Sequence, residues 1–450
     1  MRGPDTFLQR FKKYSCIAIL GATPALGRAT AATLQERSAP VLAPLADLYP
    51  GISDLYFDLH RNPELSLHEE KTSAKMAARL RDLGFEVTER VGGWGVVGVF
   101  KNGPGPTVLV RTDLDGLPVE EKTGVPYASK TTTKDDNGTT VSVMHACGHD
   151  IHMSEWIATA TLLTKAKTAW NGTLLFVGQP AEERGLGAAA MLQDQFYSRF
   201  GKPNFAISLH DDANIPAGTI GWTSGYFCAN VDSVDITFYG KGGHGAYPHK
   251  TVDPIVIGAR FVTAVQTIVA RENDPLDPAV ITVGSFHAGS KHNIISGEAR
   301  LQLTVRSYKD SVRKKLLDGI ARIAKSEAAT AGAPQEPKIT ISESIPAAYN
   351  DPALTQRLAA AVAGQLGKDK LIERPPTMGG EDFAYFGQGG IPACMLLVGA
   401  VNPERYAAAK TAGEDLPSLH SPLFAPDPEP TLKTGTTALT VMLLELLPKQ

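Results

Sequence analysis

The chain is poor in cysteine and has no concentrated run of basic residues. Its four cysteines, Cys16, Cys147, Cys228 and Cys394, lie far apart and form no CxxC pair, which excludes a disulfide scaffold and a zinc ribbon. A formal net charge of −3 without a basic face argues against a nucleic-acid partner. With 450 residues, 43% of them hydrophobic and 20% charged, the chain is long enough for two globular domains. Any metal site must recruit its ligands from distant segments.

Residues 1–45 form a separate N-terminal segment with features of an export signal. Basic residues precede an uncharged stretch at residues 14–27, and the small residues at 29–31 resemble a cleavage site. An exported or periplasmic location follows if this segment is a signal, and a cytoplasmic location if it is not. The stretch is shorter than the ~20 residues that span a bilayer, so no membrane anchor is predicted.

The same segment weakly resembles a dinucleotide-binding turn. Residues 17–21 lead to Gly27 as a strand and glycine turn would. However, Ala25 stands where that turn requires glycine, and the proline-rich stretch at residues 40–50 is predicted to break the chain before a second strand. A nucleotide site is therefore not expected.

Short apolar runs rich in β-branched residues recur on both sides of the middle of the chain. They are nearly continuous rather than alternating, as strands buried on both faces should be. Between two of them, Met153, Ile157, Ala160 and Leu163 recur at helical spacing. This pattern predicts an α/β sandwich around an internal sheet. The predicted strands are residues 96–100, 107–110, 173–177, 205–209 and 393–398.

A second unit is predicted between residues 230 and 345. Its elements follow the order βαββαβ of a ferredoxin-like module, and Asp253-Pro254 is a suitable cap and first turn for its first helix. Further ligand candidates and β-rich sequence resume afterwards, so we expect this unit to be inserted in a catalytic domain of residues 46–229 and 346–450. The predicted elements are strands 232–239, 279–286, 299–305 and 338–341, a helix from residue 254 and a helix at 310–328.

Metal-ligand residue types recur at widely separated points. The run MHACGHD at residues 144–150 places a thiol, imidazoles and a carboxylate together, and GQPAEE ends in paired glutamates. His210 is predicted to end a strand, and loops beyond the carboxyl ends of strands form the ligand crevice of an α/β sheet. Alone, His210 would be interpreted as a core or surface histidine, but the conjunction favours a metal site. The candidate ligands are Cys147, His149, Glu183, His210 and His420.

The types of these side chains indicate the chemistry. Thiolate, imidazole and carboxylate bind zinc-like ions, and five ligands are too many for one open catalytic ion, so we expect two divalent ions with a bridging group. Thiolate favours zinc over magnesium or calcium, while manganese, cobalt and nickel remain alternatives. Glu182 is then free to act as general base and acid. Asp113, which follows a predicted strand, is assigned to the catalytic group with it.

The sequence resembles the metal-dependent aminoacylase and carboxypeptidase family, in its branch of hippurate and auxin-conjugate amidohydrolases. The resemblance covers about residues 46–450 and rests on LHRNPELS, RTDLDGLP, MHACGHDIH, GQPAEE, GGHGAYPH, HNIISG, GGEDFAYF and LHSPLF, in that order. It implies a two-metal catalytic domain with an inserted dimerising lid. It also implies cleavage of N-acyl amino acids or short peptides. By matching motif, it assigns the five candidate ligands and the base Glu182.

The resemblance also suggests roles for residues of the inserted unit. In such enzymes a lid histidine comes from the partner subunit, which for this chain would be His244 in a homodimer. Asn293 and Arg306 offer donors to the carboxylate of the released amino acid. The sequence departs from the family at Arg184, at residues 211–212, where apolar residues are more common, and in a polar insert at 130–140. The first two departures are expected to alter the rim of the site. The insert is predicted to be a flexible, solvated loop, and a position at the entrance of the site is the alternative.

The predicted function is hydrolysis of the amide bond of an N-acyl amino acid to give a carboxylic acid and a free amino acid. A dipeptidase or carboxypeptidase is the alternative among hydrolases. A metal-dependent binding protein without catalysis is the alternative of another class. Glu182 argues against the last, because metal retention alone needs no free base beside the ligands.

Overall fold

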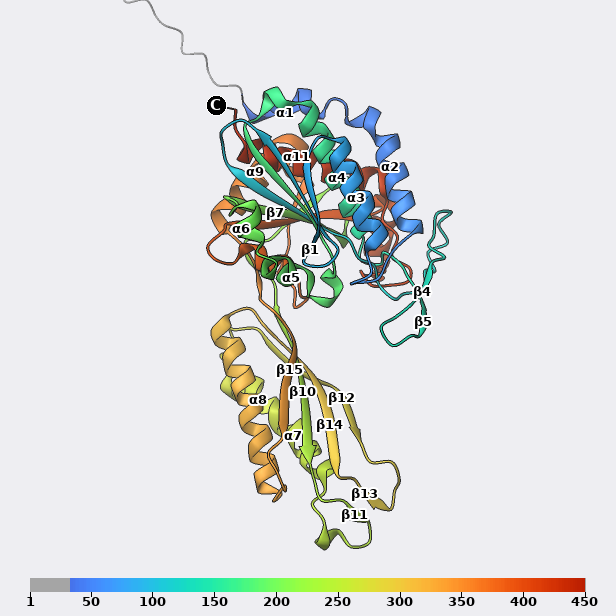
Figure 1. Ribbon diagram of the computed structural model, residues 1–450, viewed down its shortest axis with the longest axis vertical. Coiled ribbons are helices and arrows are strands. Elements are labelled where there is room, and N and C mark those ends of the chain that lie inside the picture. The colour runs from blue at the N-terminus through green and yellow to red at the C-terminus, as the bar shows by residue number, and fades with distance from the viewer. Residues whose placement is uncertain (1–32, 450) are drawn as a thin grey trace, which may run out of the picture. The chain divides into compact units, whose positions relative to one another are not determined.

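The computed structural model describes residues 33–449, and the predicted export signal and glycine turn lie in residues outside this range. Its largest element is an eight-stranded sheet whose four central strands, β6, β3, β7 and β18, run parallel (Figure 1). All five predicted strands fall in this sheet. In spatial order the strands are β1 (Glu86–Val91), β2 (Gly95–Asn102), β6 (Gly172–Gln179), β3 (Thr107–Asp113), β7 (Phe205–Pro216), β18 (Ala393–Val401), β8 (Ile220–Trp222) and β17 (Leu371–Glu373).

Successive side chains of the central strands enter two different hydrophobic cores. Val108 and Val110 of β3 pack into one core, whereas Leu109 between them packs into the other. Leu174 and Leu175 of β6 divide in the same way. Because neighbouring side chains point to opposite faces, a sheet covered on both sides must be apolar at every position. The predicted α/β sandwich is confirmed.

Helices cover both faces of this sheet (Figure 1). Packing on the first face are α1 (Leu34–Leu42), α2 (Leu45–Arg61), α3 (Glu70–Asp82), α4 (His149–Lys165), α9 (Pro352–Leu366) and α11 (Pro428–Leu446). The second face is covered by α5 (Gly187–Gln193), α6 (Phe196–Phe200) and the 3₁₀ turns at Asp382–Gly387, while α10 (Pro403–Ala412) follows β18. These two layers bury the apolar strands that the sequence predicted.

The expectation that residues 40–50 break the chain was wrong in part. The chain does turn at Pro44, but α2 continues through Pro50. Proline removes one helical hydrogen bond and crowds the preceding turn. Leu55, Tyr56 and Leu59 of the same helix are almost fully buried in the first core, and tertiary packing of this kind decides most helix stability.

A four-stranded antiparallel sheet follows, with two helices on one face (Figure 1). Its elements have the βαββαβ order, and its own hydrophobic core includes Phe238, Phe261 and Leu301, which gives the predicted ferredoxin-like architecture. Asp253 caps the first helix by accepting from the N–H of Ile255 (2.9 Å). The elements are β10 (Asn230–Tyr239), α7 (Pro254–Thr267), β12 (Ala279–Ala288), β14 (Glu298–Ser307), α8 (Asp310–Thr330) and β15 (Lys338–Ile345).

We propose that residues 230–345 are an inserted domain, flanked by the catalytic parts 46–229 and 346–450. The separate hydrophobic core supports this division. The compact unit that contains both sheets begins at Leu34. We refer to residues 230–345 as the inserted unit.

One helical stretch within residues 33–449, Pro254–Glu272, is long and apolar enough to cross a membrane by length and composition alone. It consists of α7 and a following π-helical turn. Ile257, Phe261 and Val265 on its inner side are fully buried in the core of the inserted unit. Packing against the sheet therefore accounts for its apolar composition.

Three short strand pairs complete the fold. The polar insert predicted as a flexible loop forms a hairpin, in which the carboxylate of Asp135 accepts from the N–H groups of Asn137 and Thr139 (2.9 and 2.8 Å). Gly138 supplies the positive φ of this turn. The Asp135 side chain thus stabilises the turn, and only the tip of the hairpin has irregular backbone. The pairs are β4 (Thr132–Lys134) with β5 (Thr140–Ser142), β9 (Gly225–Cys228) with β16 (Ala348–Asn350), and β11 (Gly243–His244) with β13 (Ile294–Ile295).

Candidate metal centre

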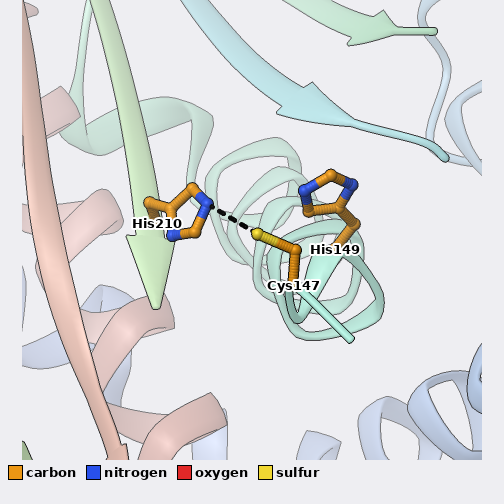
Figure 2. A group of neighbouring side chains, drawn as sticks. All are labelled: Cys147, His149 and His210. Carbon is orange, nitrogen blue, oxygen red and sulfur yellow. Dashed lines mark hydrogen bonds between the residues drawn. The ribbon is translucent and has the colours of Figure 1, made fainter. Parts of the chain in front are cut away.

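Cys147, His149 and His210 converge although they come from distant segments (Figure 2). Their ligand atoms all lie within 4.8 Å of one another, and Sγ of Cys147 is 3.5 Å from Nε2 of His210. Nδ1 of His210 donates to the carbonyl oxygen of Asp211 (2.8 Å), which leaves Nε2 facing the thiol. Gly148 allows Asp211 to pack closely against the start of α4. Its φ is 77°, and a Cβ at this position would lie 2.0 Å from a carboxylate oxygen of Asp211.

A second group of ligand atoms shares Cys147. The thiol, the Glu183 carboxylate and the His420 imidazole also lie within 4.8 Å of one another, with Nε2 of His420 3.3 Å from Glu183. The N–H of His420 donates to the carbonyl of Ala146 (2.8 Å), which ties the two loops together. His420 has a φ of 66°, an uncommon conformation for a non-glycine residue. All five predicted ligands therefore gather in two overlapping groups.

Asp115 orients several of these groups, and the sequence did not single it out. Nδ1 of His149 donates to its carbonyl oxygen (2.8 Å), so Nε2 is left to bind a metal. The Asp115 carboxylate accepts from the N–H groups of Glu182 (3.2 Å) and Glu183 (3.1 Å) and from the hydroxyl of Ser66 (2.6 Å). One buried carboxylate thus fixes both the paired glutamates and a ligand histidine.

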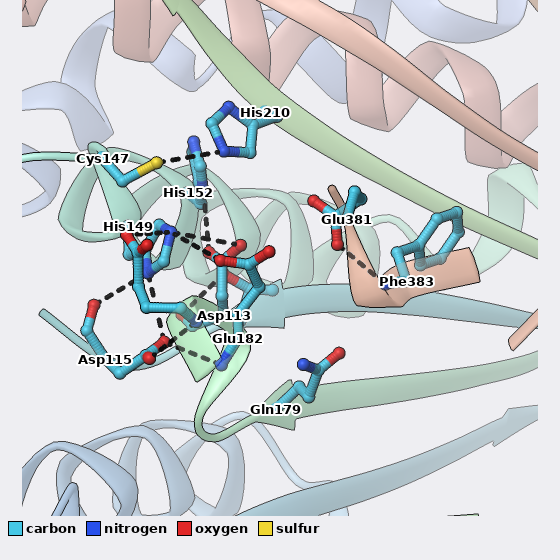
Figure 3. A network of polar contacts seen from close by, with 12 residues as sticks. Asp113, Asp115, Cys147, His149, His152, Gln179, Glu182, His210, Glu381 and Phe383 are labelled. Atoms are coloured by element: carbon cyan, nitrogen blue, oxygen red, sulfur yellow. Dashed lines mark hydrogen bonds and ion pairs between the residues drawn. The ribbon is translucent and has the colours of Figure 1, made fainter. Parts of the chain in front are cut away.

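Asp113 is buried beside the ligands and is bound to a second residue that the sequence analysis missed. Nδ1 of His152 donates to one of its oxygens (2.7 Å), and the other lies 3.7 Å from Nε2 of His149 (Figure 3). His152 follows His149 by one helical turn on α4, and this spacing could have revealed it. The N–H of Asp211 donates to Nε2 of His152 (2.8 Å), so Asp113 and Asp211 hold the ring from both sides.

The structure corrects one prediction about β7. The strand does not end at His210 but continues to Pro216. Asp211 is 1% exposed, and its carboxylate lies 3.3 Å from Nδ1 of His210 and 3.1 Å from Nε2 of His152. It therefore belongs to the buried network around the ligands. Asp211 and Asp212 both line the cavity of the site.

A buried arginine links the site to the segment after β17. The guanidinium of Arg111 is fully buried and donates to Asp113 (2.7 Å), Gln179 (2.9 Å), Glu381 (3.1 Å) and Asp382 (3.2 Å). The two acids belong to the motif GGEDFAYF, but their role as partners of Arg111 could not be read from the sequence. Since each group would be costly to bury alone, the network is expected to be rigid.

The residues present fit divalent cations. Nε2 of His149, Oε1 of Glu183 and Oδ2 of Asp211 are buried without a hydrogen-bond partner among the described residues. Burial and the nearby charges of Glu183 and Glu182 hold the pKa of the Cys147 thiol well above its usual range, and burial raises the pKa of Glu183 to about 7. Without a bound cation, it is strongly unfavourable to bury this many ionised carboxylates and a thiolate together. Bound cations would compensate this excess of negative charge.

A cavity of about 840 Å³ opens on this cluster. Arg306 of the inserted unit lines it, whereas His244 and Asn293 of the same chain do not. These two residues are neighbours in the short β11–β13 pair, where the N–H of Gly245 donates to the carbonyl of Asn293 (2.9 Å) and His244 is exposed. The contribution of His244 from a partner subunit and the contact of Asn293 with the amino-acid carboxylate stay predictions.

The tip of the hairpin β4–β5 contacts one residue that lines this cavity. Arg184, which lines the cavity, donates to Asp136 at the hairpin tip (2.6 Å). Both side chains are about half exposed, so this ion pair adds little stability. The departure at Arg184 therefore lies at the rim, as predicted.

The α/β sandwich gathers these donor atoms beside the carboxyl ends of its strands, and it carries a ferredoxin-like unit. This combination defines the class of metal-dependent hydrolases. Residues 109–417 match the family model of peptidase family M20/M25/M40, and the chain belongs to this family. The family assignment confirms the resemblance at the level of the family.

Known relatives share most of their length with this chain. Thermostable carboxypeptidase 2 of Saccharolobus solfataricus is 36% identical over 391 residues, 86% of this chain and 93% of the relative. N-acetyl-L-cysteine deacetylase of Bacillus subtilis is 34% identical over 355 residues, 79% and 81% respectively. The crystal structure of Bacillus subtilis YXEP, a dinuclear metal binding peptidase, aligns with a TM-score of 0.72 and 27% identity over 89% of this chain and 99% of that one. The chain is thus a metal-dependent hydrolase of amide or peptide bonds with a site for two divalent ions.

Proposed function

We propose that this enzyme cleaves the amide bond of N-acyl amino acids and releases a carboxylic acid and a free amino acid. The observation that carries the proposal is the position of Glu182, a carboxylate that lines the cavity 3.8 Å from Nε2 of the candidate ligand His149. N-acetyl-L-cysteine deacetylase, a relative, acts by its name on such a compound. The hippurate-like acyl group that the motifs suggest is one member of this substrate class.

Two ions would be held by the five residues Cys147, His149, Glu183, His210 and His420. We propose zinc or manganese, with cobalt or nickel as alternatives, and the thiolate favours zinc. When bound, such ions polarise a carbonyl and make water a stronger nucleophile. Asp113 positions the ligand His149 together with His152, as their 3.7 and 2.7 Å separations from its carboxylate support.

Glu182 is the proposed general base and acid. Burial, and then the charges of Glu381 and Glu183, hold the pKa of its carboxyl well above the usual range. A carboxyl group with a raised pKa can take a proton from water near neutral pH and return it to the leaving amine. The N–H of Glu182 is held by Asp115, so the backbone that carries the base is fixed.

The inserted unit would bind the amino-acid carboxylate. Arg306 is held by two hydrogen bonds, from Nη1 to the carbonyl of Met378 (2.9 Å) and from Nε to the hydroxyl of Thr304 (3.2 Å), and lines the cavity. His244 and Asn293 would reach the site of the partner subunit in a homodimer, His244 over the scissile carbonyl. The exposed large hydrophobic side chains of the inserted unit support self-association; these are Tyr247, Ile255, Val256, Leu276, Phe286, Ile294 and Ile341.

A dipeptidase or carboxypeptidase remains the second candidate. It is favoured by the name of the relative from Saccharolobus solfataricus and by the acidic side chains Asp212 and Glu343 in the cavity, which could pair with a free amine. A binding protein without catalysis would not need the buried free carboxylate of Glu182.

The test is an assay of the metal-loaded protein on N-acetyl, N-benzoyl and fatty-acyl amino acids beside matched dipeptides, with release of free amine as the readout. The proposal expects at least one acyl series to exceed the dipeptides in kcat/KM by at least about tenfold. Faster turnover of dipeptides would instead support the second candidate. Absence of turnover with both classes, despite bound metal, would contradict both.

A further inference from the structure

We propose that Arg374 is a second anion-binding residue of the substrate cavity and selects N-acyl amino acids that carry an additional carboxylate. The extra carboxylate would lie in the acyl group or in the amino-acid side chain, which offer the same chemistry to a guanidinium. This inference rests on the proposed function, because it names the substrate class of the same site.

The backbone of Arg374 is fixed on both sides. It directly follows β17, and its N–H donates to the carbonyl of Trp222 at the end of β8 (2.8 Å). Its carbonyl accepts from the hydroxyl of Thr223 (2.9 Å). The position of this arginine is therefore set by the parallel pairing of β17 with β8 and not by a free loop.

The aliphatic part of the side chain lies against Gly221. A Cβ atom at Gly221 would lie 3.0 Å from Cγ of Arg374, closer than most real Cβ contacts. The adjacent side chains of Leu397 and Ile215 crowd the same point at 3.1 and 3.2 Å. Glycine thus leaves room for the side chain to cross β8, and ordering it in advance lowers the entropy lost on binding.

The guanidinium is held at one edge only. Nε of Arg374 donates to Oδ2 of Asp212 (3.1 Å), while Oδ1 of Asp212 accepts from the N–H and side-chain amide of Asn214 (2.7 and 3.2 Å). Nη1 and Nη2 have no hydrogen-bond partner within residues 33–449. Their common edge matches the two oxygens of a carboxylate, which is the geometry in which arginine recognises this group best.

Arg374 shares the cavity with the metal ligands and with Arg306. Asp212 lies two residues beyond His210 on the same face of β7, which is ~7 Å along the strand. Residues 375–377 join Arg374 to Met378, whose carbonyl holds Arg306. Three guanidinium groups therefore border one cavity, those of Arg184, Arg306 and Arg374. Arg184 is paired with Asp136 (2.6 Å), so Arg374 is left over if Arg306 binds the amino-acid carboxylate.

A purely structural ion pair would bury both partners. Instead, the side chain of Asp212 is 9% exposed and that of Arg374 is 27% exposed. The buried Asp212 carboxylate holds the guanidinium in place, and the rest of the Arg374 guanidinium remains accessible from the cavity. Asp212 reduces the net charge at this point, so recognition would depend on the two free N–H edges rather than on long-range attraction.

The test uses metal-loaded full-length protein and two substrate pairs that differ in charge but hardly in shape. N-succinyl-L-leucine and its terminal amide probe a carboxylate in the acyl group, and N-acetyl-L-glutamate and N-acetyl-L-glutamine probe one in the side chain. We expect the charged member of at least one pair to have the higher kcat/KM by at least about tenfold, the usual effect of hydrogen bonds to a charged group.

Arg374→Gln should abolish that ratio by lowering the kcat/KM of the charged member toward that of the neutral member. Arg374→Lys should restore only part of the ratio, because lysine keeps the charge but lacks the two parallel N–H donors of arginine. Arg357→Gln is the matched control, because Arg357 pairs with Glu445 (2.6 Å) and does not line the cavity. A wild-type ratio near one in both pairs, or a ratio that survives in Arg374→Gln, overturns the inference.

Failure of the proposed function has a different signature. If no N-acyl amino acid is hydrolysed, binding of the same four compounds to the Glu182→Gln protein is measured by calorimetry. The inference then requires a charged member to bind about tenfold more tightly than its neutral partner, and Arg374→Gln to remove the difference. Equal binding of charged and neutral compounds overturns it independently of catalysis.

Discussion

The carboxylate of Glu182 lies 3.8 Å from Nε2 of His149, the ring nitrogen that has no hydrogen-bond partner among the described residues. If that nitrogen held an ion, this carboxylate would lie beside it, where it could accept a proton from water. It is also held from the backbone side by Asp115. The relationship places the proposed base beside the proposed ligands without requiring it to be one of them.

Removal of metal is expected to abolish turnover and leave the fold intact. The five ligands are attached to two large hydrophobic cores that do not depend on them. Elemental analysis should find two transition ions per chain, and circular dichroism after chelation should retain the spectrum of the holoenzyme. Unchanged turnover after exhaustive chelation would contradict the metal mechanism.

Glu182→Gln is expected to lower kcat by at least about 100-fold, because the amide keeps the size of the side chain but cannot accept a proton. Metal content should stay nearly constant. Glu183→Gln is the matched variant, since the neighbouring glutamate is a proposed ligand and its loss should release metal. If Glu182→Gln sheds metal instead, Glu182 is a ligand, and if it keeps wild-type kcat, it is not the base.

His244→Ala is expected to lower kcat with metal content intact, because the imidazole would act on the substrate in the partner subunit. Mixing this variant with Glu182→Gln should restore part of the activity, since a heterodimer has one complete site. Subunit exchange must be shown separately by mass spectrometry. Exchange without recovery of activity would exclude action across a dimer, and full activity of the variant alone would exclude His244 from the mechanism.

The buried His60 predicts a pH-dependent contribution to stability. Burial alone lowers its pKa, but hydrogen bonds and charges from Asp150 (2.6 Å) and Glu121 (3.1 Å) outweigh burial and raise the pKa to about 9. Because the folded pKa exceeds the unfolded value of 6.5, the contribution is complete below pH 6.5 and is lost as pH rises through about 9.

His60→Asn should therefore reduce the free energy of unfolding more at pH 6 than at pH 9.5, with a difference on the order of 2 kcal/mol. Urea denaturation of the holoprotein at both pH values measures it. His68→Asn is the control, since the side chains of His68 and its partner Asp136 are both about half exposed. An equal loss at both pH values would show that His60 is not protonated in the folded state.

The sequence by itself determined most of the central strands and the candidate ligand set. Runs apolar at every position predicted strands such as β3 and β6, because their burial on both faces leaves that local signature. Asp253 and Pro254 predicted the start of α7 for an equally local reason, a side chain that caps its own helix. The residue types of Cys147, His149 and His210 indicated metal before their convergence was visible.

Tertiary structure alone decided which polar groups support the ligands. Asp115 and Arg111 stand in the same short motif as Asp113, but only the pairing of distant strands brings Asp115 to Glu183 and Arg111 to Glu381. The contact of Asp211 with His152 depended on the continuation of β7 beyond His210, which the pairing of β7 with β18 decides. Likewise, Arg374 meets Asp212 only because β17 pairs with β8 and β8 with β18. Periodicity and residue type are local properties of a chain, whereas these contacts depend on strand pairing and packing between segments far apart in sequence.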